Sequence, residues 1–338
     1  MRILLIGPGS NGKHGTKLYY SEARRLLNGF IRNGHFVLHI SDRDLADYVF
    51  KFRPLGKFYA RRRIAKIAAF LQPHLVVLVH ADLVDGETID AVRAHAPGCR
   101  VVHVDFDPVS MPRAAARTKR MGDFCDCGFA TMGGDALRKA ESAAPMFFIP
   151  NLIDTSIDDQ ISYSNVSTVD IFFAGKMSEH NLQWQRAQAL RKLAPNLTYF
   201  YAGHRKSRTE MPGGVWGYKY IDKLGHSRIG LNLNRVEGDL YASSRMAQYL
   251  GNGCLLATDR ASGFQEFFSD EEMIFFSDPE ELAAKCTSLL AEDRTWRTMA
   301  ERGRARALEI MSNTLVCRFI VSMATDGKAP SDWKFTGR

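Results

Sequence analysis

The stretch from residue 229 to residue 268 restricts the possible folds most, because it alternates sharply between strand and helix patterns. The run IGLNL at its start is apolar enough for a buried strand, and CLLAT reads as the next strand. Between them, Ser243 and Ser244 can cap a helix that runs to Leu250 and ends at the glycines of Gly-Asn-Gly. A strand, a helix and a strand in this order predict a parallel βαβ unit.

The start of this helix is a candidate anion-binding site. A helix that begins at the carboxyl end of a parallel strand directs unpaired N–H groups and the positive end of its dipole into the crevice there. Arg245 lies in the first turn and adds a fixed charge whose planar geometry suits a phosphate group. The sequence therefore predicts a phosphate site at this end of the helix.

The alternation of strand and helix continues along the chain. Short apolar runs typical of buried parallel strands recur between helical segments, among them RILLIG, HFVLHI, HLVVLVH, CRVVHVDFD and VDIFFAG. With 338 residues, the chain is long enough for two domains of ordinary size. We expect an α/β fold with mostly parallel sheets, and the polar run DDQISYSNVS from 158 to 167 is the best candidate for a linker.

Composition sets broad limits on the class of protein. A hydrophobic content of 45% and a charged content of 24% are typical of a soluble globular protein, and no segment approaches the length of a membrane span. The formal net charge of +8 favours anionic partners such as nucleotide-sugars, phospholipid head groups or nucleic acid. The six cysteines show neither a zinc nor a thioredoxin spacing, so we expect reduced thiols in the core of a cytoplasmic protein.

The C-terminal half resembles the group 1 glycosyltransferases, and it is most similar to the branch of spore-maturation proteins. The resemblance rests on Arg245, the helix closing on Gly-Asn-Gly-Cys, the segment Leu-Leu-Ala-Thr-Asp259 and the segment Gly263-Phe-Gln-Glu266-Phe-Phe. A later segment, DPEELAAKCTSLLAEDRTWRTMAERGRARALE, is similar as well. The family implies a GT-B fold, in which two Rossmann-like domains face each other across a cleft and the C-terminal one holds most of a nucleotide-sugar.

The resemblance also implies domain ranges and a set of donor-binding residues. The N-terminal domain, on the acceptor side, would span residues 1–155, and the donor-binding domain would span residues 165–311. Residues 312–338 would form a helix that crosses back to the N-terminal domain, followed by a tail. The positions that match the family's donor-binding pattern are Gly175, Lys176, His204, Asn234, Ser244, Arg245, Gln248 and Glu266.

Two positions depart from the family pattern. Many group 1 enzymes carry a pair of glutamates, but the corresponding residues here are Leu240 and Gln248. Glu237 and Asp239 are close enough in sequence to replace the first glutamate. In relatives the second glutamate binds the ribose hydroxyls, and a glutamine amide can keep that contact through neutral hydrogen bonds. We therefore expect Gln248 to retain a weaker ribose contact.

The first strand pattern is followed by a glycine-rich loop, GPGSNGKHG, at residues 7–15. Formally this is the G-x-G-x-x-G spelling of dinucleotide-binding enzymes, with Asp42 at the end of the next strand as the acidic partner. Asp42 lies about thirty residues past the glycines, further than the roughly twenty of that fingerprint. In a GT-B protein the same loop would lie close to the ligand. His14 is then either a general base acting on an acceptor hydroxyl or an exposed loop histidine.

Two further strand patterns end in polar residues, one at His80 and the other at Asp105-Phe-Asp107. The ends of parallel strands line the crevice, so both are site candidates. The Asp-x-Asp spelling is also that of the metal-binding motif of GT-A glycosyltransferases. The spore-maturation branch has an acidic pair before proline at this point, with no metal implied. We therefore interpret Asp107 as an acceptor-site residue or catalytic base and expect no metal ligand here.

Residues 57–71, KFYARRRIAKIAAFL, read as a basic amphipathic helix. Ile64, Ile67 and Ala68 fall on one face, and Arg62 and Arg63 lie elsewhere on the helix. Such a helix can make peripheral contact with an anionic membrane, which would suit a lipid-linked acceptor at the inner face of that membrane. It can equally be a surface helix with its basic side in water.

These patterns lead to one principal hypothesis and two alternatives. The principal hypothesis is a cytoplasmic, metal-independent hexosyltransferase that moves a sugar from a nucleotide-diphosphate sugar to a glycan or glycoconjugate, as in polysaccharide biosynthesis. It needs no cofactor beyond the donor substrate, and nucleic acid is not among its expected partners. The alternatives are a non-catalytic nucleotide-sugar-binding protein of the same fold and an NAD-dependent oxidoreductase.

Overall fold

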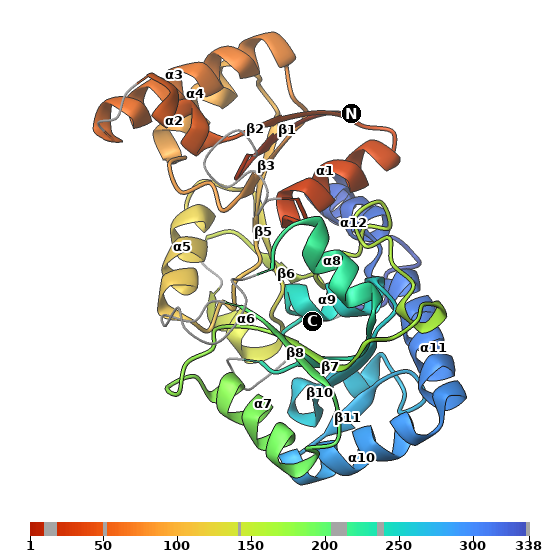
Figure 1. The fold of residues 1–338 in the computed structure, drawn as a ribbon. Helices are drawn as coiled ribbons and strands as arrows, with labels where there is room; N and C mark the ends of the chain where they lie inside the picture. Colours follow the sequence, from red (N-terminus) through yellow and green to blue (C-terminus); the bar gives the residue numbers. More distant parts are fainter. Residues whose placement is uncertain (10–18, 50–52, 141–142, 204–214, 235–239, 336–338) are drawn as a thin grey trace. The chain divides into compact units, whose positions relative to one another are not determined.

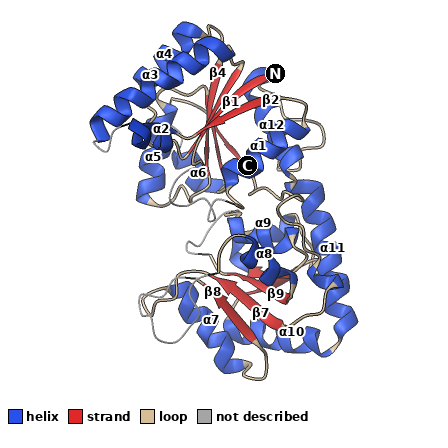
Figure 2. Ribbon diagram, turned by 45° about the horizontal axis from the view of Figure 1, so that its top comes forward, coloured by secondary structure: helices blue, strands red, loops and turns tan. Residues whose placement is uncertain are grey.

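The computed structural model describes residues 1–9, 19–49, 53–140, 143–203, 215–234 and 240–335. The chain divides into two compact units: Met1–Leu152 together with Asn313–Arg338, and Ile153–Ser312. Each unit is built on one parallel β-sheet with helices packed against it (Figures 1 and 2). The α/β class expected from the alternating strand and helix patterns is confirmed.

The N-terminal unit contains a six-stranded parallel sheet in the order β2-β1-β3-β4-β5-β6. Its strands are β1 (Arg2–Ile6), β2 (Phe36–Ile40), β3 (Leu75–Val79), β4 (Arg100–Asp105), β5 (Cys127–Ala130) and β6 (Met146–Phe148). Its helices are α1 (Glu22–Arg32), α2 (Asp42–Val49), α3 (Arg53–Leu71), α4 (Gly86–His95), α5 (Pro112–Gly122), α6 (Gly134–Ala140) and α12 (Asn313–Asp326). The strand order reverses between β1 and β3, and in open α/β sheets ligands bind at such a switch point.

The helix predicted at residues 57–71 is the C-terminal part of α3, which buries some of its apolar residues and exposes others. Ile64 and Ala68 are buried in the core of the N-terminal unit, together with the fully buried strand β3. Phe58 and Phe70 are exposed, and the cationic groups of Arg62 and Lys66 lie 5.6 and 5.9 Å from the centres of their rings. Within the described residues, no helix is long and apolar enough to cross a membrane.

Helix α12 belongs to the N-terminal unit although it lies near the end of the chain. Gly29 of α1 faces Asn313 and Cys317, and a Cβ atom at this glycine would collide with both. On another side of α12, the Phe319 ring stacks on Trp333 with 3.8 Å between ring centres. The absence of a side chain at Gly29 therefore allows the two helices to pack backbone against backbone.

The C-terminal unit contains a five-stranded parallel sheet in the order β11-β10-β9-β7-β8, with its switch point between β7 and β9. Its strands are β7 (Val169–Ala174), β8 (Tyr199–Ala202), β9 (Ser227–Asn232), β10 (Leu255–Asp259) and β11 (Ile274–Phe276). Its α-helices are α7 (Leu182–Leu193), α8 (Tyr218–Gly225), α9 (Ser244–Gly251), α10 (Pro279–Ala291) and α11 (Asp293–Met311). Short 3₁₀ helices lie at η2 (Ser162–Ser164), η3 (Arg260–Ser262) and η4 (Phe264–Glu266). One core, which includes the fully buried Trp296, joins the sheet to α7, α10 and α11.

The polar run from 158 to 167 is not a free linker, and that expectation is wrong. Asp158 and Ser162 are fully buried in the C-terminal unit. The Asp158 carboxylate accepts hydrogen bonds from the Asp154 backbone N–H at 3.1 Å and from the Asn252 side chain at 3.0 Å. The Ser162 hydroxyl donates to the Ser227 backbone carbonyl. Polar side chains can be buried in this way because each finds a hydrogen-bond partner.

Candidate functional site

Arg245 lies across the switch point of the C-terminal sheet. Its Nη1 donates to the Ala174 carbonyl oxygen at the end of β7 (3.0 Å), and its Nη2 donates to the Leu233 carbonyl oxygen after β9 (2.7 Å). The guanidinium also lies 5.9 Å from the centre of the Phe173 ring. A guanidinium carries five N–H donors in one plane, so Arg245 can join the two strand ends and still offer donors and charge to a ligand.

A chain of buried polar groups fixes the start of α9 at the same edge. Ser243, rather than Ser244, is the N-cap: its hydroxyl accepts from the Met246 N–H at 3.4 Å and donates to Asn232 Oδ1 at 2.7 Å. The Asn232 side chain in turn donates to Thr258 Oγ1 at 3.1 Å. Asn232 is the last residue of β9, and Thr258 is the residue before the last of β10. The helix therefore begins at a fixed place relative to both strands, with Ser244 as its first residue.

Two glycines bring the ends of β7 and β8 together. A Cβ atom on Gly203 would collide with the Gly175 carbonyl oxygen, so these two loops touch through their backbones. Lys176 follows Gly175 and is exposed, and its ammonium makes no hydrogen bond or ion pair with the described residues. At this edge of the C-terminal sheet, a ligand can come close to the backbone and meets an available positive charge. Both features suit a phosphate group.

One acidic group at this edge is neutralised within the protein. Asp259 ends β10, and both of its carboxylate oxygens accept hydrogen bonds from Arg186 of α7, one of them at 2.9 Å. The two side chains are 16% and 21% exposed, so the pair is only partly solvated. The negative charge of Asp259 consequently does not oppose an anion bound near Arg245.

The structure places the remaining predicted donor-binding residues in different surroundings. Gln248 is buried, and its Oε1 accepts a hydrogen bond from the Tyr220 hydroxyl at 2.9 Å. Asn234 follows β9, and its Oδ1 atom is buried without a hydrogen-bond partner among the described residues. Glu266 ends η4 and is exposed, and His204 lies outside the described residues. The ribose contact expected of Gln248 stays a prediction.

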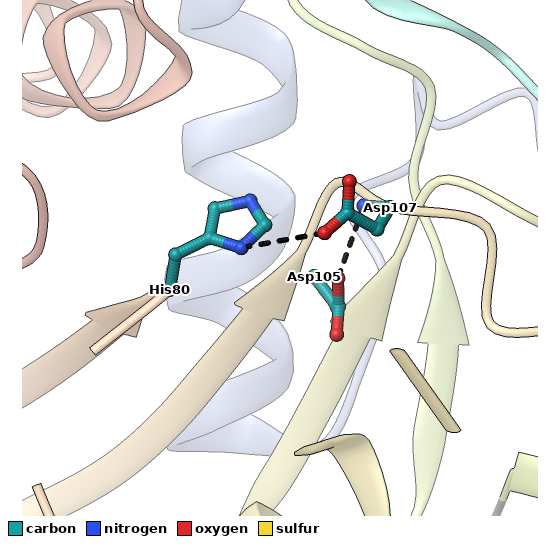
Figure 3. A group of neighbouring side chains, drawn as sticks. All are labelled: His80, Asp105 and Asp107. Atoms are coloured by element: carbon teal, nitrogen blue, oxygen red, sulfur yellow. Dashed lines mark hydrogen bonds and ion pairs between the residues drawn. The ribbon is translucent and has the colours of Figure 1, made fainter. Parts of the chain in front are cut away.

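A second cluster of polar residues lies at the carboxyl ends of β3 and β4 in the N-terminal unit (Figure 3). His80 follows β3 in a left-handed backbone conformation with φ 45°. Its Nδ1 atom lies 3.8 Å from Asp107 Oδ2, and the Asp107 backbone N–H donates to Asp105 Oδ1 at 3.0 Å. Asp105 is buried, whereas the Asp107 side chain is 56% exposed. The tertiary structure therefore joins the two strand-end motifs that the sequence predicts separately.

Arg117 of α5 completes this cluster, and the sequence analysis did not identify it. Its Nε and Nη2 atoms donate to the two oxygens of Asp105 at 3.0 and 2.6 Å, and Nη2 also donates to Asp107 Oδ2 at 2.7 Å. Burial disfavours the charged guanidinium, but the hydrogen bonds and charges of the two carboxylates outweigh it and raise the pKa of Arg117 above its usual value. Nothing in the local sequence of α5 marks this arginine as a partner of β4.

His80, Asp105 and Asp107 could supply one ligand atom each to a metal ion, since these atoms lie within 4.8 Å of one another. Their other contacts make this a poor metal site. Asp105 Oδ2 accepts from Arg117 and from the Thr118 hydroxyl at 3.0 Å, while Oδ1 accepts from Arg117 and the Asp107 N–H. A positive group already lies between the carboxylates, and a divalent ion would have to displace it.

The switch point of the N-terminal sheet lies beside this cluster. A Cβ atom on Gly7, after β1, would lie 2.7 Å from the Val79 carbonyl oxygen at the end of β3. Glycine at position 7 is therefore required for the close approach of the two strand ends. His14 and most of the glycine-rich loop lie outside the described residues, so its role as a base stays a prediction.

Two parallel α/β sheets with these strand orders match the GT-B glycosyltransferase fold, and solved structures carry the match. An α-glucosyltransferase in complex with UDP and a 13-mer DNA superposes with a TM-score of 0.70 over 96% of this chain and 100% of its own, at 12% identity. HepE from Anabaena, in complex with UDP and glucose, gives a TM-score of 0.61 over 96% and 99%, at 12% identity. A glycosyltransferase involved in avilamycin A biosynthesis gives 0.56 over 96% of each chain, at 15% identity. The chain has the GT-B fold.

Sequence similarity points to the same class of protein. Residues 182–315, from α7 into α12, match the family model described as glycosyl transferase-like. The curated proteins include no significant match to this chain. The resemblance to glycosyltransferases is thereby confirmed, and the narrower resemblance to the spore-maturation branch stays a prediction.

The exclusion of nucleic acid from the expected partners is wrong. Structures that share this fold hold DNA together with UDP or UDP-glucose, including a complex with DNA containing an abasic site. The exclusion accompanied the expectation of a glycan or glycoconjugate acceptor. A fold used by both kinds of protein cannot support it.

Proposed function

We propose that this protein is a glycosyltransferase that uses a nucleotide-diphosphate sugar and binds the diphosphate at the switch point of the C-terminal sheet. The observation that carries the proposal is the position of Arg245, whose guanidinium spans the ends of β7 and β9 next to the start of α9. Together with the exposed Lys176, these groups would stabilise the negative charge that develops on the departing diphosphate. Such a site needs no metal ion for charge neutralisation.

UDP is the first nucleotide to test, because the similar solved structures were determined with UDP or UDP-glucose. For the acceptor, the group 1 resemblance supports a hydroxyl of a glycan or glycoconjugate. A nucleic-acid acceptor is the second candidate, favoured by the net charge of +8 and by the DNA in the similar structures. Incubation with radiolabelled UDP-glucose and either duplex DNA or an oligosaccharide pool separates the two, since the label moves to only one of them.

A thermal-shift screen over UDP, GDP, CMP, ADP, dTDP and NAD tests the donor site. A ligand present at one hundred times its dissociation constant adds about 2.7 kcal/mol to the free energy of unfolding. We expect one nucleoside diphosphate to raise the melting temperature clearly more than NAD does, with the same shift in the presence of EDTA. A shift with NAD alone would favour the oxidoreductase alternative. Binding of a nucleotide-sugar without its slow hydrolysis would favour the non-catalytic one.

A further inference from the structure

Arg117 occupies an unusual place for a positively charged side chain. Its side chain is 18% exposed, and its guanidinium lies between a buried carboxylate, Asp105, and an exposed one, Asp107. It reaches both with hydrogen bonds of 2.6 to 3.0 Å, two of which form a bidentate pair with Asp105. Charge-assisted bidentate pairs of this kind fix the orientation of both partners.

This arrangement has a consequence for Asp107. Its Oδ2 atom accepts from Arg117, and its backbone N–H is held by Asp105, so the residue is restrained at both its side chain and its main chain. The His80 ring lies near the same carboxylate, with Nδ1 3.8 Å from Oδ2 (Figure 3). Asp107 is nevertheless 56% exposed, so a ligand can reach the carboxylate that the buried groups hold in place.

We propose that Arg117 is a positioning residue whose guanidinium takes the place of a divalent cation between Asp105 and Asp107 and fixes Asp107 to accept the hydrogen bond of the acceptor hydroxyl. The proposal rests on the proposed glycosyltransferase function for the identity of that ligand. The carboxyl ends of the strands in the two units would then bind groups of opposite character. The N-terminal cluster, with two carboxylates and one guanidinium, suits a hydroxyl donor, whereas the C-terminal edge suits a phosphate.

A purely structural ion pair would have the same geometry but different consequences. If Arg117 only stabilises α5 against β4, its loss lowers stability and leaves the kcat of hydrolysis unchanged. If it replaces a cation, its loss leaves two carboxylates and His80 within ligand distance of one another and without a counter-charge. Such a set of oxygen and nitrogen ligands should then bind a divalent ion.

Arg117→Met tests this difference, because it removes the charge and keeps a straight apolar side chain. We expect the variant, titrated with Mn²⁺ alone, to bind one ion that the wild type does not bind, measured by loss of the free Mn²⁺ signal in electron paramagnetic resonance. Its kcat for hydrolysis of UDP-glucose should fall by up to about 100-fold, because misplacement of a reacting group by ~1 Å has an effect of that size. KM should change little, and Mn²⁺ should restore part of the rate.

Arg113→Met is the matched control, because Arg113 lies one turn earlier on α5 and is exposed. It should behave as the wild type in every measurement, and Asp107→Asn in the Arg117→Met background should abolish Mn²⁺ binding. A folded Arg117→Met protein that takes up no Mn²⁺, or that keeps the wild-type kcat, overturns the proposal. Should Arg117→Met not fold, Arg117→Lys replaces it; an ammonium cannot bridge both carboxylates as a fork, so a wild-type kcat there is equally decisive.

Failure of the proposed function gives a different result. A wild-type protein that binds no nucleoside diphosphate and hydrolyses no nucleotide-sugar contradicts the glycosyltransferase assignment. The Mn²⁺ titration is read without any nucleotide and still decides whether Arg117 holds the place of a cation. UDP should shift the melting temperatures of wild type and Arg117→Met equally, since the variant leaves the C-terminal unit unchanged.

Discussion

His103 lies on β4 two residues before Asp105 and is 3% exposed, with its Nε2 atom unpaired among the described residues. Burial lowers the pKa of His103 to about 4, a stronger effect than the opposing charge of Asp105. Gly128 of β5 leaves room for the ring, since a Cβ atom there would collide with the imidazole. The folded protein therefore holds this histidine neutral beneath the Asp105 cluster.

The pH dependence of stability should reveal this buried neutral histidine. An unfolded histidine takes up a proton near pH 6.5, whereas folded His103 does so only near pH 4. Between these values the unfolded state binds more protons, so stability falls as the pH is lowered, by at most about 1.4 kcal/mol per pH unit. Urea unfolding at pH 7, 6 and 5 measures this slope.

His103→Gln should flatten the slope, because glutamine stays neutral at every pH. Burial also lowers the pKa of His39, so part of the slope will remain in the variant. An unchanged slope in His103→Gln would show that His103 is not held neutral by the fold.

At the scale of secondary-structure elements, the C-terminal site depends on how β7, β9 and α9 meet. Ser243 fixes the start of α9 through Asn232, and Arg245, in the first turn of that helix, reaches back to the carbonyl groups at both strand ends. The same arginine therefore connects the elements and contributes charge. Its two roles should be separable by substitution.

Arg245→Met should weaken the binding of the preferred nucleoside diphosphate by roughly 10- to 100-fold, which corresponds to the loss of a charged hydrogen bond of about 1.5–3 kcal/mol. Arg245→Lys should bind with intermediate affinity, because an ammonium keeps the charge but not the planar fork. Isothermal titration calorimetry measures both. Lys192→Met, at the exposed C-terminal end of α7, serves as the control. Wild-type affinity in a folded Arg245→Met protein would remove Arg245 from the site.

At the scale of the whole molecule, the two ends of the chain form one unit. Phe319 of α12 packs against Phe129 and Phe147, with ring centres 5.9 and 6.5 Å away, and stacks on Trp333. The C-terminal segment thus packs against strands β5 and β6, which precede it by about half of the sequence. The N-terminal unit is complete only when the last helix has been made.

Phe319→Ala should lower the free energy of unfolding by about 3–5 kcal/mol, the usual cost of removing a large buried ring. The neighbouring Arg318 is a matched control, because it forms a solvent-exposed ion pair with Asp332. Arg318→Ala should cost no more than about 1 kcal/mol. Chemical denaturation of the three proteins measures the difference. Equal stability of Phe319→Ala and wild type would mean that α12 contributes little to the N-terminal unit.

The sequence by itself determined the class of fold, because strand and helix periodicities are local. The apolar run LVVLV became the fully buried strand β3, and the strand–helix–strand pattern at 229–268 became β9, α9 and β10. The resemblance to glycosyltransferases rested on residues that the family model also covers. The sequence also located Arg245 in the first turn of a helix, because this residue directly follows the two serines that can cap the helix.

Only the tertiary structure decided which polar residues meet. The run at 158–167 reads as a linker because nothing local shows that Asp158 is bonded to Asn252 or Ser162 to Ser227. Arg117 carries no signal for the same reason: its partners lie at the end of β4 and in the loop after it, twelve and ten positions earlier. Periodicity reports which face of an element is buried. A hydrogen bond between elements depends on the packing of the whole unit, which no local pattern encodes.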